Sequence, residues 1–232
     1  MQKTYKHLFF DLDHTLWDFD KNSELTLTRL YLEHDLPSRG INDFVEFNTR
    51  FNEHNDRLWV RYRGGYIRRE ELRWKRFWLT LLDFKIGDTA LAHELSSAYL
   101  EILPTQTTLM PAAKELLDHC SKKYTLHLIT NGFETTQWLK LQYSGIASYF
   151  KEVITSEKSN SLKPHPGIFD YALKATGARM DESIMIGDAL EIDVRGAYNA
   201  GWDQVYYNPF KKAHDGAPTY EVHHLNDLLE IF

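Results

Sequence analysis

Hydrophobic and polar residues in the first half of the chain follow the spacing of helices. In the clearest segment, five large hydrophobic residues fall on one helical face: Trp74, Phe77, Trp78, Leu81 and Leu82. Similar spacing predicts helices over roughly Ser23–His34, from Asn42 to the Gly64–Gly65 pair, and from an N-cap at Asp88 to Ile102. Residues 17–104 are therefore predicted to form an all-helical insert.

The remaining chain alternates between short hydrophobic runs and helical segments. Strands are predicted over His7–Phe10, Tyr124–Ile129, Val153–Thr155, Ser183–Ile186 and Gln204–Tyr207. Helices are predicted over Ala112–Lys122 with Pro111 in its first turn, Glu134–Tyr143, Pro166–Thr176 and Asp193–Ala200. This alternation predicts an α/β fold: a Rossmann-like parallel sheet with helices on both faces, built from residues 1–16 and 105–232.

Composition excludes several classes of protein. The chain has 232 residues, 43% of them hydrophobic, and a net charge of only −6, so we expect a folded protein rather than a disordered one. Asp11 and Asp13 interrupt the hydrophobic N-terminal run, and no run approaches the roughly 20 apolar residues of a membrane helix. Cys120 has no second cysteine to pair with, and we expect a soluble cytoplasmic protein.

Charge is unevenly distributed along the chain. Residues 57–76 carry eight basic and two acidic side chains, a charge of +6, while the rest carries 19 basic against 31 acidic residues, or −12. A local basic patch on an acidic protein indicates a small anionic ligand rather than a nucleic acid polymer. The patch also contains aromatic residues and permits two interpretations: a nucleotide-binding surface, or the favoured one, a helix pair with a solvated basic face.

Four segments with polar side chains end a predicted strand or closely follow one. They are Asp11-Leu12-Asp13-His14-Thr15, Thr130-Asn131-Gly132, Lys163-Pro164, and Gly187-Asp188 followed by Asp193. Each alone is typical of a turn, but ligands of open α/β sheets bind beyond the carboxyl ends of the strands. Together, the four segments therefore predict phosphoryl transfer to a carboxylate.

The aspartates suit the separate parts of that chemistry. Asp11 at a strand end presents a carboxylate that can act as nucleophile. Asp13 lies two residues on, which by strand alternation places it on the same side, where it can act as general acid and base. Asp188 adds an oxygen ligand for Mg²⁺, which binds one or two carboxylates together with substrate phosphate and water.

The remaining polar groups are expected to receive negative charge. The Thr130 hydroxyl, the amides of Asn131 and Gly132, and the Lys163 ammonium are candidates for binding the transferring phosphoryl group. Two carboxylates 4 Å apart repel by about 4 kcal/mol at an effective dielectric constant of 20. Bringing Asp11, Asp188 and Asp193 together therefore requires Lys163 and a divalent cation.

These motifs resemble those of the haloacid dehalogenase (HAD) superfamily. Phe10–Leu16 is similar to the first motif, and Thr130, Lys163 and Gly187-Asp188…Asp193 to the second, third and fourth. Three flanking segments further resemble the YjjG-type pyrimidine 5′-nucleotidases: Thr15–Phe19, Leu128–Phe133 and Lys163–Phe169.

The resemblance implies roles for the site residues. It implies that the carboxylates of Asp11 and Asp188 and the backbone carbonyl of Asp13 bind Mg²⁺, and that Asp193 orients Lys163 or a metal-bound water. It also implies that residues 17–104 form a cap over an α/β core. Asp13 argues against dehalogenation, and Ala189 stands where many relatives carry serine.

The favoured function is a Mg²⁺-dependent phosphomonoester hydrolase that forms an aspartyl-phosphate and acts on pyrimidine nucleoside 5′-monophosphates. The alternatives are a sugar-phosphate or phosphoglycolate phosphatase, or a β-phosphoglucomutase-like phosphotransferase. A receiver-type phosphoacceptor module is disfavoured by Asp13 and the insert, and dinucleotide and P-loop motifs are absent from the sequence. We expect a monomer or homodimer that binds a small phosphate ester, with substrate contacts from Phe19, Asn22, Arg61 and Tyr66.

Overall fold

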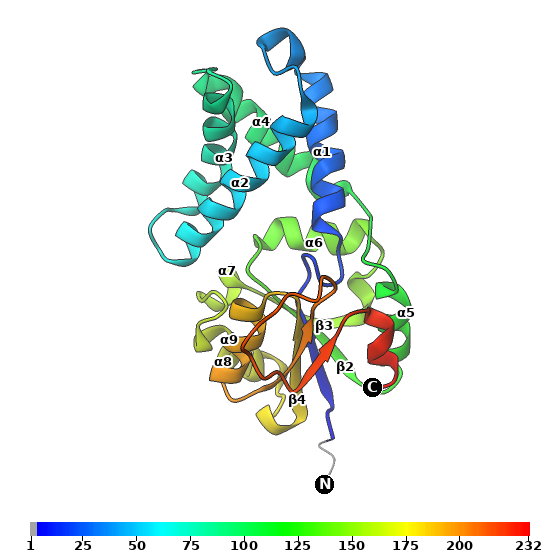
Figure 1. The fold of residues 1–232 in the computed structure, drawn as a ribbon. Coiled ribbons are helices and arrows are strands. Elements are labelled where there is room, and N and C mark those ends of the chain that lie inside the picture. Colours follow the sequence, from blue (N-terminus) through cyan, green and yellow to red (C-terminus); the bar gives the residue numbers. More distant parts are fainter. Residues whose placement is uncertain (1–3) are drawn as a thin grey trace. The chain divides into compact units, whose positions relative to one another are not determined.

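A parallel β-sheet forms the centre of the α/β part of the chain (Figure 1). The structure, a computed structural model, describes residues 4–232. Within them the sheet has six strands in the order β3-β2-β1-β4-β5-β6, and all neighbouring strands pair in parallel. Their bounds are β1 (His7–Phe10), β2 (Thr125–Thr130), β3 (Phe150–Thr155), β4 (Ser183–Gly187), β5 (Asp203–Tyr207) and β6 (Tyr220–Val222). The predicted parallel α/β fold is therefore confirmed.

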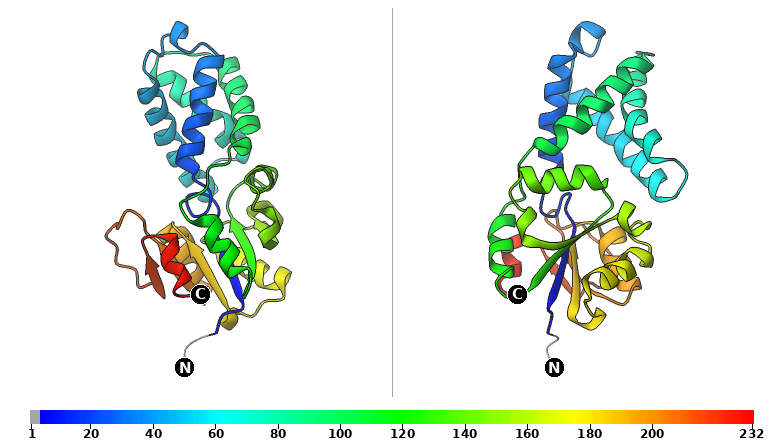
Figure 2. Two further views of the ribbon diagram at one scale, coloured as in Figure 1. Left: turned by 90° about the vertical axis from the view of Figure 1, so that its right-hand side faces the viewer. Right: turned by 180° about the vertical axis from the view of Figure 1, so that it is seen from behind.

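Helices cover both faces of this sheet, as predicted. They are α5 (Ala113–Cys120), α6 (Glu134–Tyr143), α7 (Ser156–Ser159), α8 (Pro166–Thr176) and α9 (Arg195–Asn199). Figure 2 shows α5 on one face and α8 with α9 on the other. On the α8 face, Phe9 and Met185 from the sheet join one buried cluster with Phe169 and Trp202. Burial on both faces explains why these strands are continuous hydrophobic runs rather than alternating ones.

Residues Asp20–Gln106 form a second compact unit, separate from the unit made of the residues up to Phe19 together with Thr107–Phe232. Its helices are α1 (Phe19–Glu33), α2 (Phe44–Arg63), α3 (Arg69–Asp83) and α4 (Thr89–Ile102). The Asp88 carboxylate accepts a hydrogen bond from the Leu91 amide at 2.9 Å, which confirms the predicted N-cap of α4. That residues 17–104 act as a cap stays a prediction.

Arg76 departs from the interpretation of a solvated basic face. Its side chain is buried in the helical unit, where its guanidinium donates to Asn55 Oδ1 at 3.1 Å and lies 4.5 Å from the Tyr99 ring centroid. Burial lowers the pKa of Arg76, and the nearby Tyr99 opposes this effect. The aromatic faces attract the cation in place of water, so part of the basic stretch belongs to the interior.

Three local predictions differ from the structure. Pro111 does not begin α5, because Ala112 adopts a left-handed conformation (φ 64°) and the helix starts at Ala113. The predicted helix at Asp193 begins earlier, as a π-helical turn over Leu190–Val194 that leads into α9. Strand β6 was not predicted, since three residues are too few for a clear alternation.

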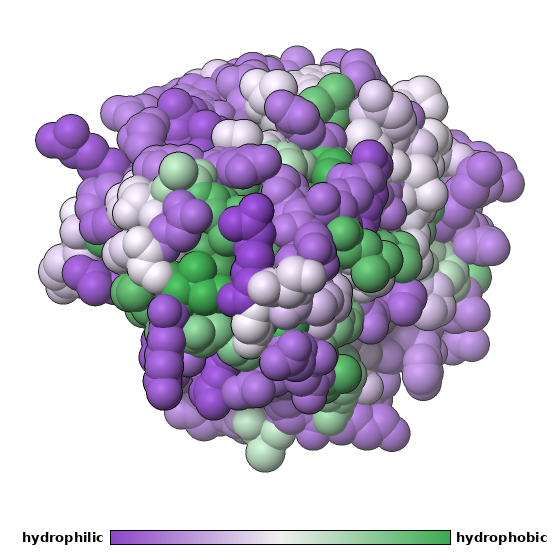
Figure 3. Space-filling model, turned by 90° about the horizontal axis from the view of Figure 1, so that it is seen from above, coloured by the Kyte–Doolittle hydropathy of each residue, from purple (hydrophilic) through white to green (hydrophobic). Residues whose placement is uncertain are grey.

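The surface is largely polar where it can be seen. In the space-filling view of Figure 3, hydrophilic residues cover most of the visible face and hydrophobic residues form smaller groups. Among residues 4–232, no helix combines the length and hydrophobicity needed to cross a membrane.

Candidate active site

The first motif forms a tight turn directly after β1. Asp11 continues the pairing of β1 with β4, because its amide donates to the Ile186 carbonyl at 2.9 Å. The Leu12 carbonyl then accepts from the amides of Leu16 and Trp17, both at 2.9 Å, which closes the turn. This geometry places the largely buried Asp11 carboxylate at the carboxyl end of the central strand, where α/β sheets bind ligands.

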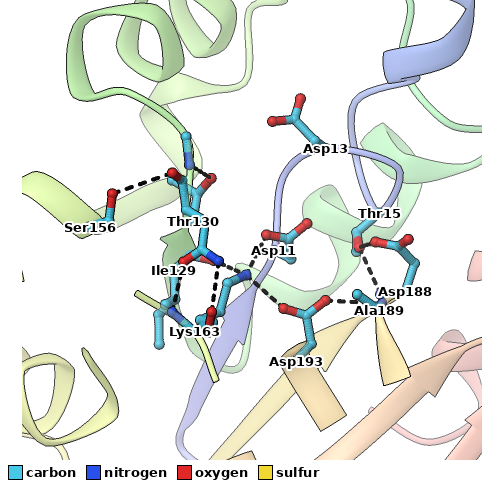
Figure 4. Close-up of polar contacts among 12 residues, drawn as sticks. Asp11, Asp13, Thr15, Ile129, Thr130, Ser156, Lys163, Asp188, Ala189 and Asp193 are labelled. Carbon is cyan, nitrogen blue, oxygen red and sulfur yellow. Dashed lines mark hydrogen bonds and ion pairs between the residues drawn. The ribbon is translucent and has the colours of Figure 1, made fainter. Parts of the chain in front are cut away.

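Lys163 lies between two of the predicted aspartates (Figure 4). Its buried Nζ is 2.5 Å from Asp11 Oδ1 and 2.7 Å from Asp193 Oδ1, and it donates to the Ile129 carbonyl at 2.8 Å. The Asn131 side chain fixes the lysine backbone: its Oδ1 accepts from the Lys163 amide at 2.7 Å and its Nδ2 donates to the Lys163 carbonyl at 2.9 Å. Lys163 is therefore held both at its backbone and at its ammonium group.

Asp188 completes a cluster of carboxylates with Asp11 and Asp193. Thr15 Oγ1 donates to Asp188 Oδ1 at 3.0 Å and accepts from the Asp188 amide at 3.1 Å, so the first motif orients the fourth. One carboxylate oxygen from each aspartate lies within 4.8 Å of the others. The structure thus brings together the three acidic side chains that the sequence singled out for this position.

Burial makes this cluster electrostatically costly. It raises the pKa of Asp11 to about 8; Lys163 opposes the rise, and the charges of Asp193 and Asp188 add to it. The pKa of Asp188 rises to about 7, chiefly through burial and then through Asp193. Burial also disfavours the Lys163 ammonium, but Asp11 and Asp193 outweigh it and raise the pKa of Lys163.

These residues fit a divalent cation. The three clustered carboxylates include only two that contact the Lys163 ammonium, so an excess of negative charge is left at the cluster. Carboxylate oxygens are the ligands that Mg²⁺ prefers. Asp11 and Asp188 are the side chains that would hold the ion, while Asp193 is already engaged with Lys163 and accepts from the Ala189 amide at 3.1 Å.

The Thr130 hydroxyl is oriented to donate. Its Oγ1 accepts from Gln137 Nε2 at 2.6 Å and from the Gly132 amide at 3.1 Å. A hydroxyl has two lone pairs and one hydrogen, so these contacts leave the Thr130 proton for another acceptor, such as a phosphate oxygen. Because the Gly132 amide donates to Thr130, its predicted contact with phosphate stays a prediction, as does that of the Asn131 amide.

Asp13 is oriented by a helix rather than by strand alternation. Strand β1 ends at Phe10, so the alternation argument does not apply, and Asp13 lies in the turn (Figure 4). Its carboxylate binds two buried residues of α6: Lys140 Nζ lies 2.5 Å from Oδ1, and Gln137 Nε2 donates to Oδ2 at 3.0 Å.

Sequence reasoning missed Thr15, Gln137 and Lys140. Thr15 lies inside the first motif, where a hydroxyl close to two aspartates was the available signal. Gln137 and Lys140 are three residues apart on the helix that follows the second motif, so they share a helical face. Their polar character on a helix packed in an α/β unit was the signal that could have found them.

The predicted substrate residues fall into two groups. Phe19 belongs to the α/β unit, where its ring centroid lies 5.1 Å from that of His14. Asn22, Arg61 and Tyr66 belong to the helical unit: Asn22 is buried in α1, Arg61 is exposed in the last turn of α2, and Tyr66 is 78% exposed. Their contacts with a substrate stay predictions.

Comparison with known proteins places this chain among enzymes of one family. The family model for haloacid dehalogenase-like hydrolases matches residues 5–201. The chain is 33% identical to pyrimidine 5′-nucleotidase PynA of Streptococcus pneumoniae over 97% of its length and 94% of the relative. It is 32% identical to pyrimidine 5′-nucleotidase YjjG of Escherichia coli, covering 97% and 96% of the two chains.

Further similarity extends to a phosphatase and to a solved structure. Glyceraldehyde 3-phosphate phosphatase of Pyrococcus abyssi is 30% identical, with 97% of this chain and 93% of that protein covered. The magnesium-bound crystal structure of the putative HAD-hydrolase YfnB from Bacillus subtilis superposes with a TM-score of 0.89 at 29% identity, covering 99% of each chain. With its four motifs gathered at the strand ends, the chain belongs to the haloacid dehalogenase-like hydrolase family.

Proposed function

We propose that this protein is a Mg²⁺-dependent phosphomonoesterase that works through an aspartyl-phosphate. The observation that carries the proposal is the buried Asp11 carboxylate at the end of β1, held by Lys163 and accompanied by Asp188 and Asp193. These residues provide a nucleophile, the Lys163 ammonium beside it, and oxygen ligands for a metal ion. The phosphatase and nucleotidase names of the relatives support the same class of reaction.

The first half of the proposed reaction transfers the phosphoryl group to Asp11. A carboxylate oxygen of Asp11 forms a bond to phosphorus while the bond between phosphorus and the ester oxygen breaks. Asp13 gives its proton to the departing ester oxygen. Lys163 and the Thr130 hydroxyl donate to the oxygens of the transferring group and so stabilise its charge.

The second half releases phosphate. Asp13 takes a proton from a water molecule whose oxygen forms a bond to phosphorus, and the bond between phosphorus and Asp11 breaks. Mg²⁺, when bound by Asp11, Asp188 and the Asp13 carbonyl, would neutralise the carboxylates and the phosphate oxygens. We assign Asp193 to holding Lys163 in place, since its Oδ1 lies 2.7 Å from the ammonium.

The substrates we propose are pyrimidine nucleoside 5′-monophosphates. The support is the similarity to two pyrimidine 5′-nucleotidases over nearly the whole chain. Phe19, Asn22, Arg61 and Tyr66 are the proposed contacts with the nucleoside. A small sugar phosphate is the second candidate, because a glyceraldehyde 3-phosphate phosphatase is 30% identical over a similar length.

A panel of phosphate esters tests the proposal. Phosphate release from UMP and dUMP is compared with release from glyceraldehyde 3-phosphate and phosphoglycolate, with Mg²⁺ and again with a chelator. We expect the nucleotides to be preferred and the chelator to abolish turnover. Preference for the sugar phosphate would support the second candidate, and turnover that persists with the chelator would contradict the role of the metal.

Substitution of Asp11 tests the nucleophile. Asp11→Asn removes the charged oxygen that attacks phosphorus, so phosphate release should be lost. Asp170→Asn is the matched control, because Asp170 is exposed on α8. Activity of the Asp11 variant close to that of the control would exclude Asp11 as the nucleophile.

A further inference from the structure

Helix α6 holds the carboxylate of Asp13 by both of its oxygens. Lys140 Nζ lies 2.5 Å from Oδ1, and Gln137 Nε2 donates to Oδ2 at 3.0 Å. Gln137 and Lys140 are three residues apart, so their side chains leave the same face of the helix. Two donors on two oxygens fix the plane of a carboxylate, whereas a single contact would leave it free to rotate.

The Lys140 ammonium is itself firmly placed. The residue is 2% exposed, and its Nζ lies 4.2 Å from the ring centroid of Trp17 and 5.5 Å from that of Phe19. Aromatic faces attract a cation, and they fix its position above the turn that carries Asp13. A buried ion pair is often no more stabilising than apolar residues of the same size. Stability alone therefore gives little reason for a lysine at this position.

Gln137 connects Asp13 to the hydroxyl of Thr130. The same Nε2 donates to Asp13 Oδ2 at 3.0 Å and to Thr130 Oγ1 at 2.6 Å. Gly132 leaves the space for this side chain, because a Cβ atom there would lie 2.4 Å from Gln137 Nε2. One amide group thus sets the position of the proposed proton donor relative to the proposed phosphate-binding hydroxyl.

We propose that Lys140 and Gln137 are positioning residues that orient the Asp13 carboxylate for its two proton transfers. The inference rests on the proposed function, since it assigns these residues to the proposed general acid and base. Neither residue needs to touch the reacting atoms, because Lys140 acts through Asp13, and Gln137 acts through Asp13 and through the Thr130 hydroxyl that it also contacts.

Esters with different leaving groups distinguish this positioning role from a merely structural one. An alkyl phosphate must leave as an alcohol and needs the Asp13 proton, whereas p-nitrophenolate leaves unassisted. Loss of Asp13 orientation should therefore lower kcat/KM for UMP and leave kcat/KM for p-nitrophenyl phosphate close to the wild-type value. Release of phosphate from Asp11 still requires Asp13 as base, so kcat for p-nitrophenyl phosphate should fall and a burst of p-nitrophenolate should precede steady turnover.

The test compares Lys140→Met and Gln137→Met with matched controls. Lys174→Met replaces an exposed lysine of α8, and Gln142→Met replaces an exposed glutamine of α6. In Lys140→Met we expect kcat/KM for UMP to fall about tenfold to a hundredfold, because misorientation of Asp13 should forfeit only part of the roughly 10²–10⁴-fold that general acid–base catalysis contributes. The loss in Gln137→Met should be smaller because the ion pair remains, and the controls should match wild type on both esters.

A double variant links the effect to Asp13. If Lys140 acts through Asp13, then Lys140→Met should add little to the loss already caused by Asp13→Asn, because contacting residues of one network are not additive. Equal losses on both esters without a burst, or a gain of activity, would overturn the proposal. Should Lys140→Met not fold by circular dichroism, Gln137→Met decides through the difference between its losses on the two esters, because a loss through its other partner Thr130 would affect both esters equally. An inactive wild-type protein would instead overturn the proposed function, and this inference with it.

Discussion

At the scale of single residues, close packing around the acidic cluster explains why a glycine stands at position 187. Gly187 precedes Asp188, and a Cβ atom at this position would lie 2.4 Å from Asp193 Oδ2 and 2.6 Å from Asp193 Cβ. Asp193 is almost fully buried and holds Lys163, so it has little room to move. The glycine at the end of β4 therefore serves the position of the lysine beside Asp11.

Gly187→Ala should weaken both activity and stability. The added methyl group forces Asp193 away from Lys163, and overpacking of this kind typically costs about 1–3 kcal/mol of unfolding free energy. Gly87→Ala is the control, because no atom lies within 4 Å of a Cβ at that position. Denaturant unfolding and phosphate release measure the two effects. If Gly187→Ala keeps the wild-type activity and the wild-type unfolding free energy, Asp193 can shift without consequence.

His127 makes the stability of the sheet depend on pH. Its side chain is buried in β2, stacks on Phe9 and shares a hydrogen bond of 3.1 Å with His7. Burial, and next the charge of His7, lower the pKa of His127 to about 4. In the unfolded chain this histidine binds a proton near pH 6.5, whereas in the folded chain it does so only near pH 4. The free energy of unfolding should therefore keep its full value above about pH 6.5 and decrease as the pH falls toward 4.

The protonation of His127 should be measurable as a change in the free energy of unfolding with pH. Between pH 7 and pH 5 the wild-type protein should lose about 2 kcal/mol more than His127→Phe, which has no imidazole to protonate at this position. His165→Phe replaces an exposed histidine and should keep the wild-type dependence on pH. Parallel pH profiles for wild type and His127→Phe, measured by urea titration, would rule out this source of acid sensitivity.

At the scale of elements, the sequence predicts correctly the helices and strands whose ends are determined by nearby residues. Strand β1 and helices α6 and α8 have the predicted bounds, because hydrophobic runs and periodic faces mark them within a few residues. The left-handed Ala112, the π-helical turn at Leu190 and the short strand β6 depend on tertiary packing, and no local pattern predicts them. The contact of Lys140 with Asp13 spans 127 residues of sequence, so it needed the fold.

The N-cap of α4 provides a test at this scale. Asp88 satisfies the Leu91 amide at the start of the helix, and its removal in Asp88→Ala should cost about 1 kcal/mol of unfolding free energy. Asp88→Asn keeps an acceptor of comparable capping strength and should stay near wild type. Thermal and denaturant unfolding compare the two variants. A loss as large in the asparagine variant as in the alanine variant would mean that charge, rather than capping, stabilises α4.

At the scale of the whole molecule, the α/β unit gathers its site from four widely separated segments. Asp11, Thr130 and Asp188 lie at the carboxyl end of a strand or directly after it, and Lys163 lies in the loop after the short helix α7 that follows β3. The parallel sheet brings these strand ends to the same edge. This is why the members of the cluster could be predicted from the sequence. The contacts of Thr15, Gln137 and Lys140 required the folded arrangement, even though their polar character is visible in the sequence, since each contacts a residue that another segment supplies.

Metal binding should therefore stabilise the folded protein as a whole. The buried carboxylates repel one another in the folded state and are far apart when the chain is unfolded, so a cation that binds the cluster favours folding. At a Mg²⁺ concentration about 100 times the dissociation constant, the gain is about 2.7 kcal/mol. Differential scanning calorimetry with Mg²⁺ and with chelator should show a higher melting temperature with the metal. Asp188→Asn should lose most of that shift, whereas Asp170→Asn, which changes the net charge equally on exposed α8, should keep it. A shift of equal size in both variants would assign the effect to general screening and remove Asp188 as a ligand.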